Sequence, residues 1–92
     1  MTNQYENVDD YFVACFEDLK NEIPTSWEYS GYHNDACPSW TVKDLHIFID
    51  HPEPTMREYK TWKRFYVSKI DDQEPVMETD SFDDLLKFVK KY

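Results

Sequence analysis

The stretch Asp44-Leu45-His46-Ile47-Phe48-Ile49-Asp50 decides the fold, because its side chains change character at every second residue. Aliphatic side chains at positions 45, 47 and 49 alternate with His46 and Phe48. Successive side chains of a β-strand point to opposite faces of the sheet, so this period of two indicates a strand with one apolar face. The sequence therefore predicts a central strand that ends at the breaker His51-Pro52-Glu53-Pro54.

Further segments extend this strand into a predicted antiparallel meander. Residues 63–70 alternate Phe65 and Val67 with more polar positions, and they are predicted to form a second good strand. The aromatic-rich segment 27–32 is a third candidate, with Gly31 as a bulge or bend, and 76–79 is a short edge strand after the 71–75 turn. Residues 56–62 are compatible with an extended chain or with a helical turn.

Amphipathic helices are predicted on both sides of the meander. From Val8 to Ile23, apolar side chains recur at spacings of three and four, Asn7 is a candidate N-cap, and Pro24 stops the helix. The last helix begins after Asp80 or Ser81 and carries its apolar stripe at positions 82, 85, 86 and 89. The expected fold is α+β, with two helices, N- and C-terminal, packed on one face of a three- to four-stranded antiparallel β-meander.

Length and composition indicate one acidic domain over residues 1–92. The chain is 40% hydrophobic and 17% aromatic, enough to fold around one core. It contains no run of about 18 apolar residues, and its first residues lack the basic and apolar regions of a signal peptide. We therefore expect a cytoplasmic protein in which Cys15 and Cys37 are free thiols.

Catalytic and metal-binding signatures are weak. Gly31 is the only glycine, so the chain cannot form a glycine-rich phosphate loop, which excludes the nucleotide enzymes that use one. Cys37 with His33 or His46 could form a nucleophile and base, but no further signature accompanies them. His33, Cys37, His46 and His51 are acceptable zinc ligands in a spacing that fits no standard zinc motif. The prediction is a protein that is not an enzyme and has no metal or cofactor.

Charge is the strongest functional signal: 19 acidic and 10 basic residues give a formal net charge of −9. Residues 1–53 carry −9, 54–70 carry +4, 71–84 carry −7 and 85–92 carry +3. The basic stretch 57–69 is interleaved with aromatic residues, as in some nucleic-acid-binding strands, but the overall field repels a polyanion. We expect these cations to pair with neighbouring carboxylates, with neither nucleic acid nor membrane as a direct partner.

The acidic blocks have two interpretations. In the first, they solubilise an aromatic-rich domain and cap its helices. In the second, they imitate nucleic-acid phosphates and occupy the DNA-binding cleft of a basic protein, which requires the outer face of the first helix to meet the 71–80 region in space. The candidate phosphate-mimicking residues are Asp9, Asp10, Glu17, Asp18, Glu22, Asp71, Asp72, Glu74, Glu78, Asp80, Asp83 and Asp84.

In its length, its acidity, its helix–strands–helix order and the aspartates that open its helices, the chain resembles the small DNA-mimic anti-restriction proteins of phages, the T4 Arn type above all. The resemblance implies an α+β homodimer in the host cell cytoplasm whose acidic surface mimics duplex DNA. It also implies two kinds of partner, a restriction endonuclease of the McrBC type and a histone-like nucleoid protein. The +4 segment is a departure from an all-acidic mimic.

An alternative function is a protein-interaction module without mimicry. It would bind a protein partner through an exposed aromatic surface, which aromatic residues favour because they bury a large area at low entropic cost. The candidate residues are Trp27, Tyr29, Tyr32, Trp40 and Trp62.

Overall fold

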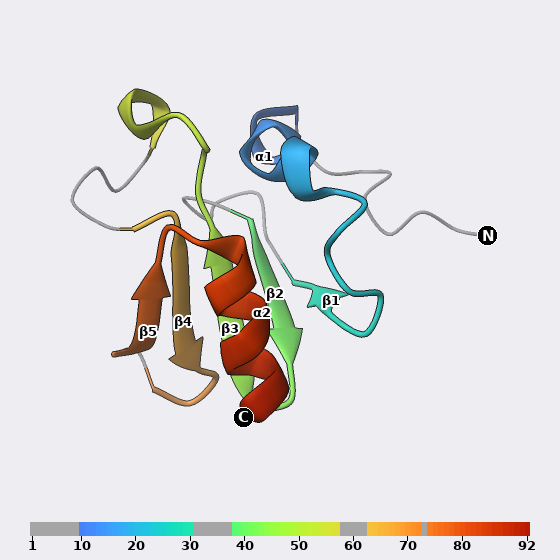
Figure 1. Cartoon of the computed structure of the whole chain (residues 1–92), viewed down its shortest axis with the longest axis vertical. Helices are drawn as coiled ribbons and strands as arrows, with labels where there is room; N and C mark the ends of the chain where they lie inside the picture. The colour runs from blue at the N-terminus through green and yellow to red at the C-terminus, as the bar shows by residue number, and fades with distance from the viewer. Residues whose placement is uncertain (1–9, 31–37, 58–62, 73) are drawn as a thin grey trace.

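The computed structural model describes residues 10–30, 38–57, 63–72 and 74–92, and its strands form one five-stranded antiparallel sheet (Figure 1). The strands lie in the sheet in chain order, so the sheet is a meander. The elements are α1 (Asp10–Phe16), η1 (Glu17–Leu19), β1 (Glu28–Tyr29), β2 (Ser39–Val42), β3 (Leu45–Ile49), η2 (Pro54–Met56), β4 (Phe65–Lys69), β5 (Pro75–Thr79) and α2 (Phe82–Lys91). The predicted α+β class is confirmed, with five strands instead of three or four.

The core lies on the sheet face that the alternation of β3 predicts. Leu45, Ile47 and Ile49 are fully buried, and the register places Ile47 between Trp40 of β2 and Val67 of β4. Burial of such side chains contributes about 1.5–3 kcal/mol each. The same hydrophobic cluster includes residues of α1, η1 and α2, so the helical segments on both sides of the strands pack on this face.

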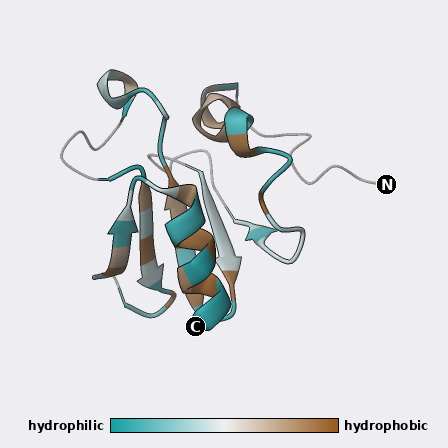
Figure 2. Ribbon diagram, in the orientation of Figure 1, coloured by the Kyte–Doolittle hydropathy of each residue, from teal (hydrophilic) through white to brown (hydrophobic). Residues whose placement is uncertain are grey.

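Helix α2 follows its predicted start and polarity. The Ser81 hydroxyl accepts a hydrogen bond from the Asp84 backbone N–H at 3.3 Å, which satisfies one of the free donors of the first turn. Leu85 and Val89 are buried, and lysines occupy the last turn. Figure 2 shows the resulting alternation of hydrophobic and hydrophilic segments along α2.

The first helix is shorter than the predicted span of 8–23. The α-helix ends at Phe16, a 3₁₀ turn follows, and the Glu22 and Ile23 backbone N–H groups both close onto the Leu19 carbonyl at 2.8 and 3.0 Å. These tighter turns still bring Ile23 into the core. The apolar side chains of this segment are therefore buried although the helix is not continuous; they are Phe12, Cys15, Phe16, Leu19 and Ile23. Phe16 packs edge-on against Trp40 at 5.0 Å between ring centroids. Asn7 and the residues around it lie outside the described residues.

Strand β2 is absent from the sequence-based prediction. It is joined to β3 by the two-residue turn Lys43-Asp44, in which Lys43 has φ of 57°. Such turns require positive φ and usually carry Asn or Gly, so a lysine hides the hairpin from sequence analysis. Strand β1 is only two residues long, and β5 confirms the predicted edge strand. The turn η2 ends at Met56, the first residue of the undecided segment, Arg57 is extended, and 58–62 lies outside the described residues.

Candidate binding surface

Arg64, at the start of β4, links the first helical segment to the sheet. Its side chain is 9% exposed, and its guanidinium donates to the Asp50 and Cys15 carbonyls at 3.0 and 2.9 Å. The remaining donors form a two-point ion pair with Asp18, at 3.0 Å from Nη1 to Oδ2 and 2.6 Å from Nη2 to Oδ1. The hydrogen bonds from Arg64 lower the pKa of the Asp18 carboxyl below its usual value. One predicted phosphate mimic is therefore part of an internal ion pair.

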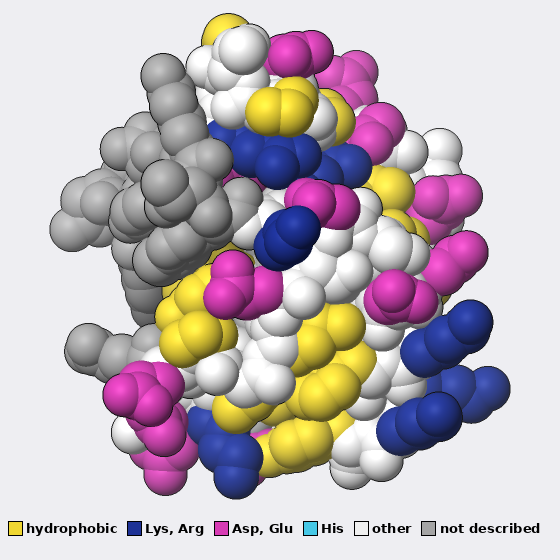
Figure 3. All heavy atoms as spheres, turned by 60° about the vertical axis from the view of Figure 1, so that its left-hand side comes forward, with side chains coloured by type: hydrophobic (Ala, Val, Ile, Leu, Met, Phe, Trp, Pro, Cys, Tyr) yellow, Lys and Arg dark blue, Asp and Glu magenta, His cyan; other side chains and the backbone are white. Residues whose placement is uncertain are grey.

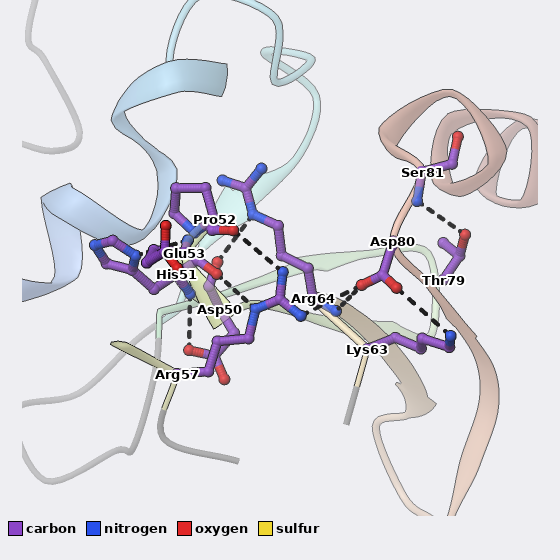
Figure 4. A network of polar contacts seen from close by, with 10 residues as sticks. All are labelled: Asp50, His51, Pro52, Glu53, Arg57, Lys63, Arg64, Thr79, Asp80 and Ser81. Carbon is purple, nitrogen blue, oxygen red and sulfur yellow. Dashed lines mark hydrogen bonds and ion pairs between the residues drawn. The ribbon is translucent and has the colours of Figure 1, made fainter. Parts of the chain in front are cut away.

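Asp80, just before α2, attaches the start of this helix to Arg64 at the beginning of β4 (Figure 4). Its Oδ1 accepts from the Arg64 backbone N–H at 2.9 Å, and its carboxylate also pairs with Arg57 at 3.4 Å and with Lys63 at 3.5 Å. The Arg64 backbone hydrogen bond, with help from the two cations, holds the pKa of Asp80 below its usual value. The expected pairing of the basic segment with carboxylates is thus observed for Arg57, Lys63 and Arg64.

A second set of contacts orders the segment after β3. The Arg57 guanidinium donates to the carbonyls of His51 and Pro52 at 2.7 and 3.3 Å (Figure 4). The Asp50 carboxylate accepts from the His51 backbone N–H at 2.8 Å, and His51 Nδ1 accepts from the Glu53 backbone N–H at 3.0 Å. These contacts give Arg57 and His51 structural roles in the connection between β3 and β4.

The candidate phosphate-mimicking carboxylates that the structure describes are all exposed to solvent. Asp9 lies outside the described residues. Among the described candidates, ion pairs within 4 Å are formed by Asp18 and Asp80. The exposed candidates are Asp10, Glu17, Asp18, Glu22, Asp71, Asp72, Glu74, Glu78, Asp80, Asp83 and Asp84.

These carboxylates fall at two ends of the sheet. The α1–η1 segment and the start of α2 meet at the end where Arg64 contacts both Asp18 and Asp80. The acidic turn 71–74 follows β4 at the opposite end, where the Ile70 backbone N–H bonds the Asp44 carbonyl at 2.9 Å. On the face drawn in Figure 3, acidic groups are separated by Lys and Arg side chains and by a hydrophobic patch. Within the part of the chain that the structure describes, the 71–80 region therefore meets the first acidic block only through Asp80.

The prediction of an exposed aromatic surface is wrong for Trp27 and Trp40, the two candidate tryptophans that the structure describes. Trp27 is 3% exposed and Trp40 is fully buried, and both belong to the hydrophobic core. Tyr29 is half-buried and packs on Trp40 at 5.3 Å between ring centroids. Tyr32 and Trp62 lie outside the described residues. Strand alternation places Tyr29 and Trp40 on the face that the helices cover, and Trp27, which directly precedes β1, packs into the same core.

Catalytic chemistry finds little support in the described residues. The Cys15 thiol is fully buried, and its burial raises its pKa to about 12, so it is not a thiolate nucleophile at neutral pH. His46 packs on Phe48 at 4.3 Å between ring centroids, and His51 holds the turn after β3. Within the described residues, no group of three or more His, Cys, Asp or Glu side chains is placed to hold a metal ion. His33 and Cys37 lie outside this part of the chain.

A shallow apolar groove of about 320 Å³ lies between α2 and the turn that joins β2 to β3. Trp27, Val42, Leu86 and Val89 contribute to its lining, and Lys43 and Lys90 stand at its polar margin. The Lys43 ammonium donates to the Val89 carbonyl at 2.8 Å, where a cation is favoured by the helix dipole. Lys43 thus serves to attach α2 to the sheet.

Comparison with protein-family models, with curated proteins and with solved structures finds no match to this chain. In the described part of the chain, neither helix has the length and apolar character needed to cross a membrane.

Proposed function

We propose that this protein is a non-catalytic inhibitor that occupies the DNA-binding site of a basic DNA-binding protein. The observation that carries the proposal is the set of exposed carboxylates on α1, η1, the following turn and the first turn of α2, all at the Arg64 end of the sheet. We call this surface the acidic end; it is smaller than the surface expected from the sequence, because within the described residues only Asp80 of the 71–80 region lies beside the first helical segment. Its residues are Asp10, Glu17, Asp18, Glu22, Asp83 and Asp84.

The acidic end is held by two fixed points of the fold. Arg64 attaches η1 to the sheet through Asp18, and Asp80 attaches the start of α2 to β4. A charged surface that is already ordered loses little conformational entropy on binding, which favours affinity. It also attracts a basic partner at long range and so raises the association rate.

The partners that suit this surface are proteins that bind DNA phosphates. A restriction endonuclease of the McrBC type and a histone-like nucleoid protein are the two candidates, and each presents a basic surface to DNA. The alternative interaction module gains no support, because Trp27 and Trp40 are buried. Arg57, Lys63 and Arg64 of the basic segment are paired with carboxylates, which reduces their repulsion of a basic partner at the acidic end.

Competition with DNA tests the proposal. A fluorescein-labelled DNA duplex is bound in turn to a purified McrBC-type endonuclease and to a purified histone-like protein, and this protein is titrated in while anisotropy is measured. We expect displacement of the duplex from at least one target. Displacement should weaken as salt rises from about 50 to about 200 mM, because opposite charges are screened.

Matched charge reversals locate the binding surface. The double variant Glu17→Lys/Glu22→Lys changes the acidic end, whereas Asp71→Lys/Asp72→Lys makes the same change in charge at the other end of the sheet. We expect the first variant to lose at least about tenfold in competition and the second to lose much less. Failure to displace DNA from either target, or equal losses in the two variants, would overturn the proposal.

A further inference from the structure

Strand β5 forms one edge of the sheet and is exposed along most of its length. Among the strands of the described residues it pairs only with β4, and the other edge of their sheet is the two-residue strand β1. Within β5, Pro75, Val76 and Glu78 are exposed. An edge strand presents backbone N–H and C=O groups that have no partner within its own sheet, and another chain can pair with them.

The register shows which backbone groups of β5 point outward. Backbone hydrogen bonds of 2.9 Å from Asp50 to Arg64 and from Ile70 to Asp44 mark residues 64 and 70 as facing β3. Hydrogen-bonded and non-hydrogen-bonded pairs alternate in an antiparallel ladder, so residues 65 and 67 face β5. Their partners Thr79 and Met77 therefore point toward β4. Glu78 lies between these two, and its backbone N–H and C=O point away from the sheet.

The segment that contains this edge strand carries only negative charges. Between residues 70 and 80 there are five acidic residues and no basic one. Glu78 lies opposite Tyr66 in the ladder. Burial raises the pKa of the Tyr66 hydroxyl, and the carboxylates of Glu78, Asp72 and Glu74 raise it further. A cationic strand beside β5 would therefore be attracted to it.

The same charge disfavours a second copy of this chain at the edge. Antiparallel pairing of two β5 strands centred on Glu78 places the two Glu78 side chains opposite each other, and like charges in that position are destabilising. Pro75 and the register shift near Val67 further limit self-pairing, as in other protected edges. Charge complementarity thus selects a basic occupant.

We propose that the outer edge of β5 binds an extended basic segment of a partner protein by β-strand addition. The partner's backbone hydrogen-bonds to the N–H and C=O of Glu78, and its Lys or Arg side chains lie beside the Glu78 carboxylate. Its alternate side chains lie beside Met77 and Thr79, where apolar residues fit. This surface is separate from the acidic end, so the inference holds whether or not the protein displaces DNA.

The test uses the full ¹⁵N-labelled chain and the peptide acetyl-Lys-Val-Lys-Val-Lys-Val-Lys-amide. NMR titration gives the affinity, and amide hydrogen exchange locates the added strand. At a peptide concentration of about ten times Kd, exchange of the Glu78 amide should slow by about tenfold. The amides of Met77 and Thr79, which already face β4, should slow less. No slowing at Glu78 would overturn the proposal.

Two controls separate strand addition from general attraction of a cationic peptide. A peptide of the same charge with Pro in place of each Val cannot add a strand, and it should not protect Glu78. Glu78→Gln should weaken binding of the valine peptide by about two- to fivefold, whereas Glu17→Gln, the same charge change at the acidic end, should leave it unchanged. Equal binding of the proline peptide, or equal effects of the two variants, would contradict the proposal.

Discussion

Arg64 and Asp18 form a two-point ion pair across 46 residues of sequence, with one N–O distance of 2.6 Å and one of 3.0 Å. Arg64 is nearly buried, whereas the Asp18 side chain is 47% exposed. The guanidinium also donates hydrogen bonds to the carbonyls of Cys15 and Asp50. Arg64 therefore joins η1 and the end of α1 to the ends of β3 and β4. This pair is a polar connection between the N-terminal helical segment and the sheet.

Removal of the Asp18 charge should destabilise the protein. Asp18→Asn leaves the Arg64 guanidinium without its carboxylate while the rest of the side chain stays buried. We expect a loss of about 1–3 kcal/mol in the free energy of unfolding, reduced from the cost for a fully buried pair because Asp18 is half-exposed. Urea denaturation measures it, with Glu17→Gln as the control. Equal stability of the two variants would show that the pair contributes nothing.

Acidification should weaken the same network. In the folded protein the pKa values of Asp18 and Asp80 lie below the ordinary 3.8, so the unfolded chain binds these two protons more tightly. Their contribution to stability is therefore present above pH 3.8 and is lost as the pH falls through the lowered values. Urea denaturation between about pH 5 and about pH 2 should show this loss, and the slope should be smaller in Asp18→Asn. Asp10→Asn, outside the network, should keep the wild-type slope.

Cys15 should be unreactive in the folded protein. Its thiol is fully buried, and burial raises its pKa to about 12, so both access and ionisation oppose reaction. In a Cys37→Ser variant, which leaves Cys15 as the single thiol, we expect modification by a disulfide reagent at neutral pH to be at least about 100-fold slower than in urea. Similar rates in buffer and in urea would contradict the burial of this residue.

At position 43, glycine should give a more stable protein than alanine. Its φ of 57° lies in the left-handed region, and its ammonium donates to the Val89 carbonyl. Lys43→Ala loses that hydrogen bond and keeps the unfavourable backbone, whereas Lys43→Gly loses the bond but relieves the backbone. We expect the glycine variant to be more stable by about 1 kcal/mol in thermal or urea unfolding. A more stable alanine variant would contradict the turn geometry.

Local patterns in the sequence predict much of this fold. The alternation around Ile47 identifies β3 and its buried face, and the Ser81 cap with its following stripe identifies α2. The sequence does not predict strand β2, because the turn at Lys43 lacks the Asn or Gly that usually marks a two-residue hairpin turn. The end of α1 escapes it because Ile23 remains part of the apolar stripe after the chain has left the helix.

The candidate surface is less predictable than the fold. Sequence identifies the carboxylates and their exposure, but it does not show that Asp18 is paired with Arg64, because that contact depends on packing across distant segments. Aromatic content alone suggested a surface at Trp27 and Trp40, whereas both fill the core. The outward direction of the Glu78 backbone follows from the sheet register, which no local pattern determines.

The meander also bears on how the chain folds. Each strand pairs with the next one along the sequence, so most of the sheet has low contact order and can form quickly from successive hairpins. The contacts from Arg64 to Asp18 and from Lys43 to Val89 each span 46 residues and require large loops to close. A nascent chain that has not yet emerged beyond residue 64 lacks the Arg64 side chain that binds Asp18, so we expect this polar attachment of the first helical segment to form only after β4 is synthesised.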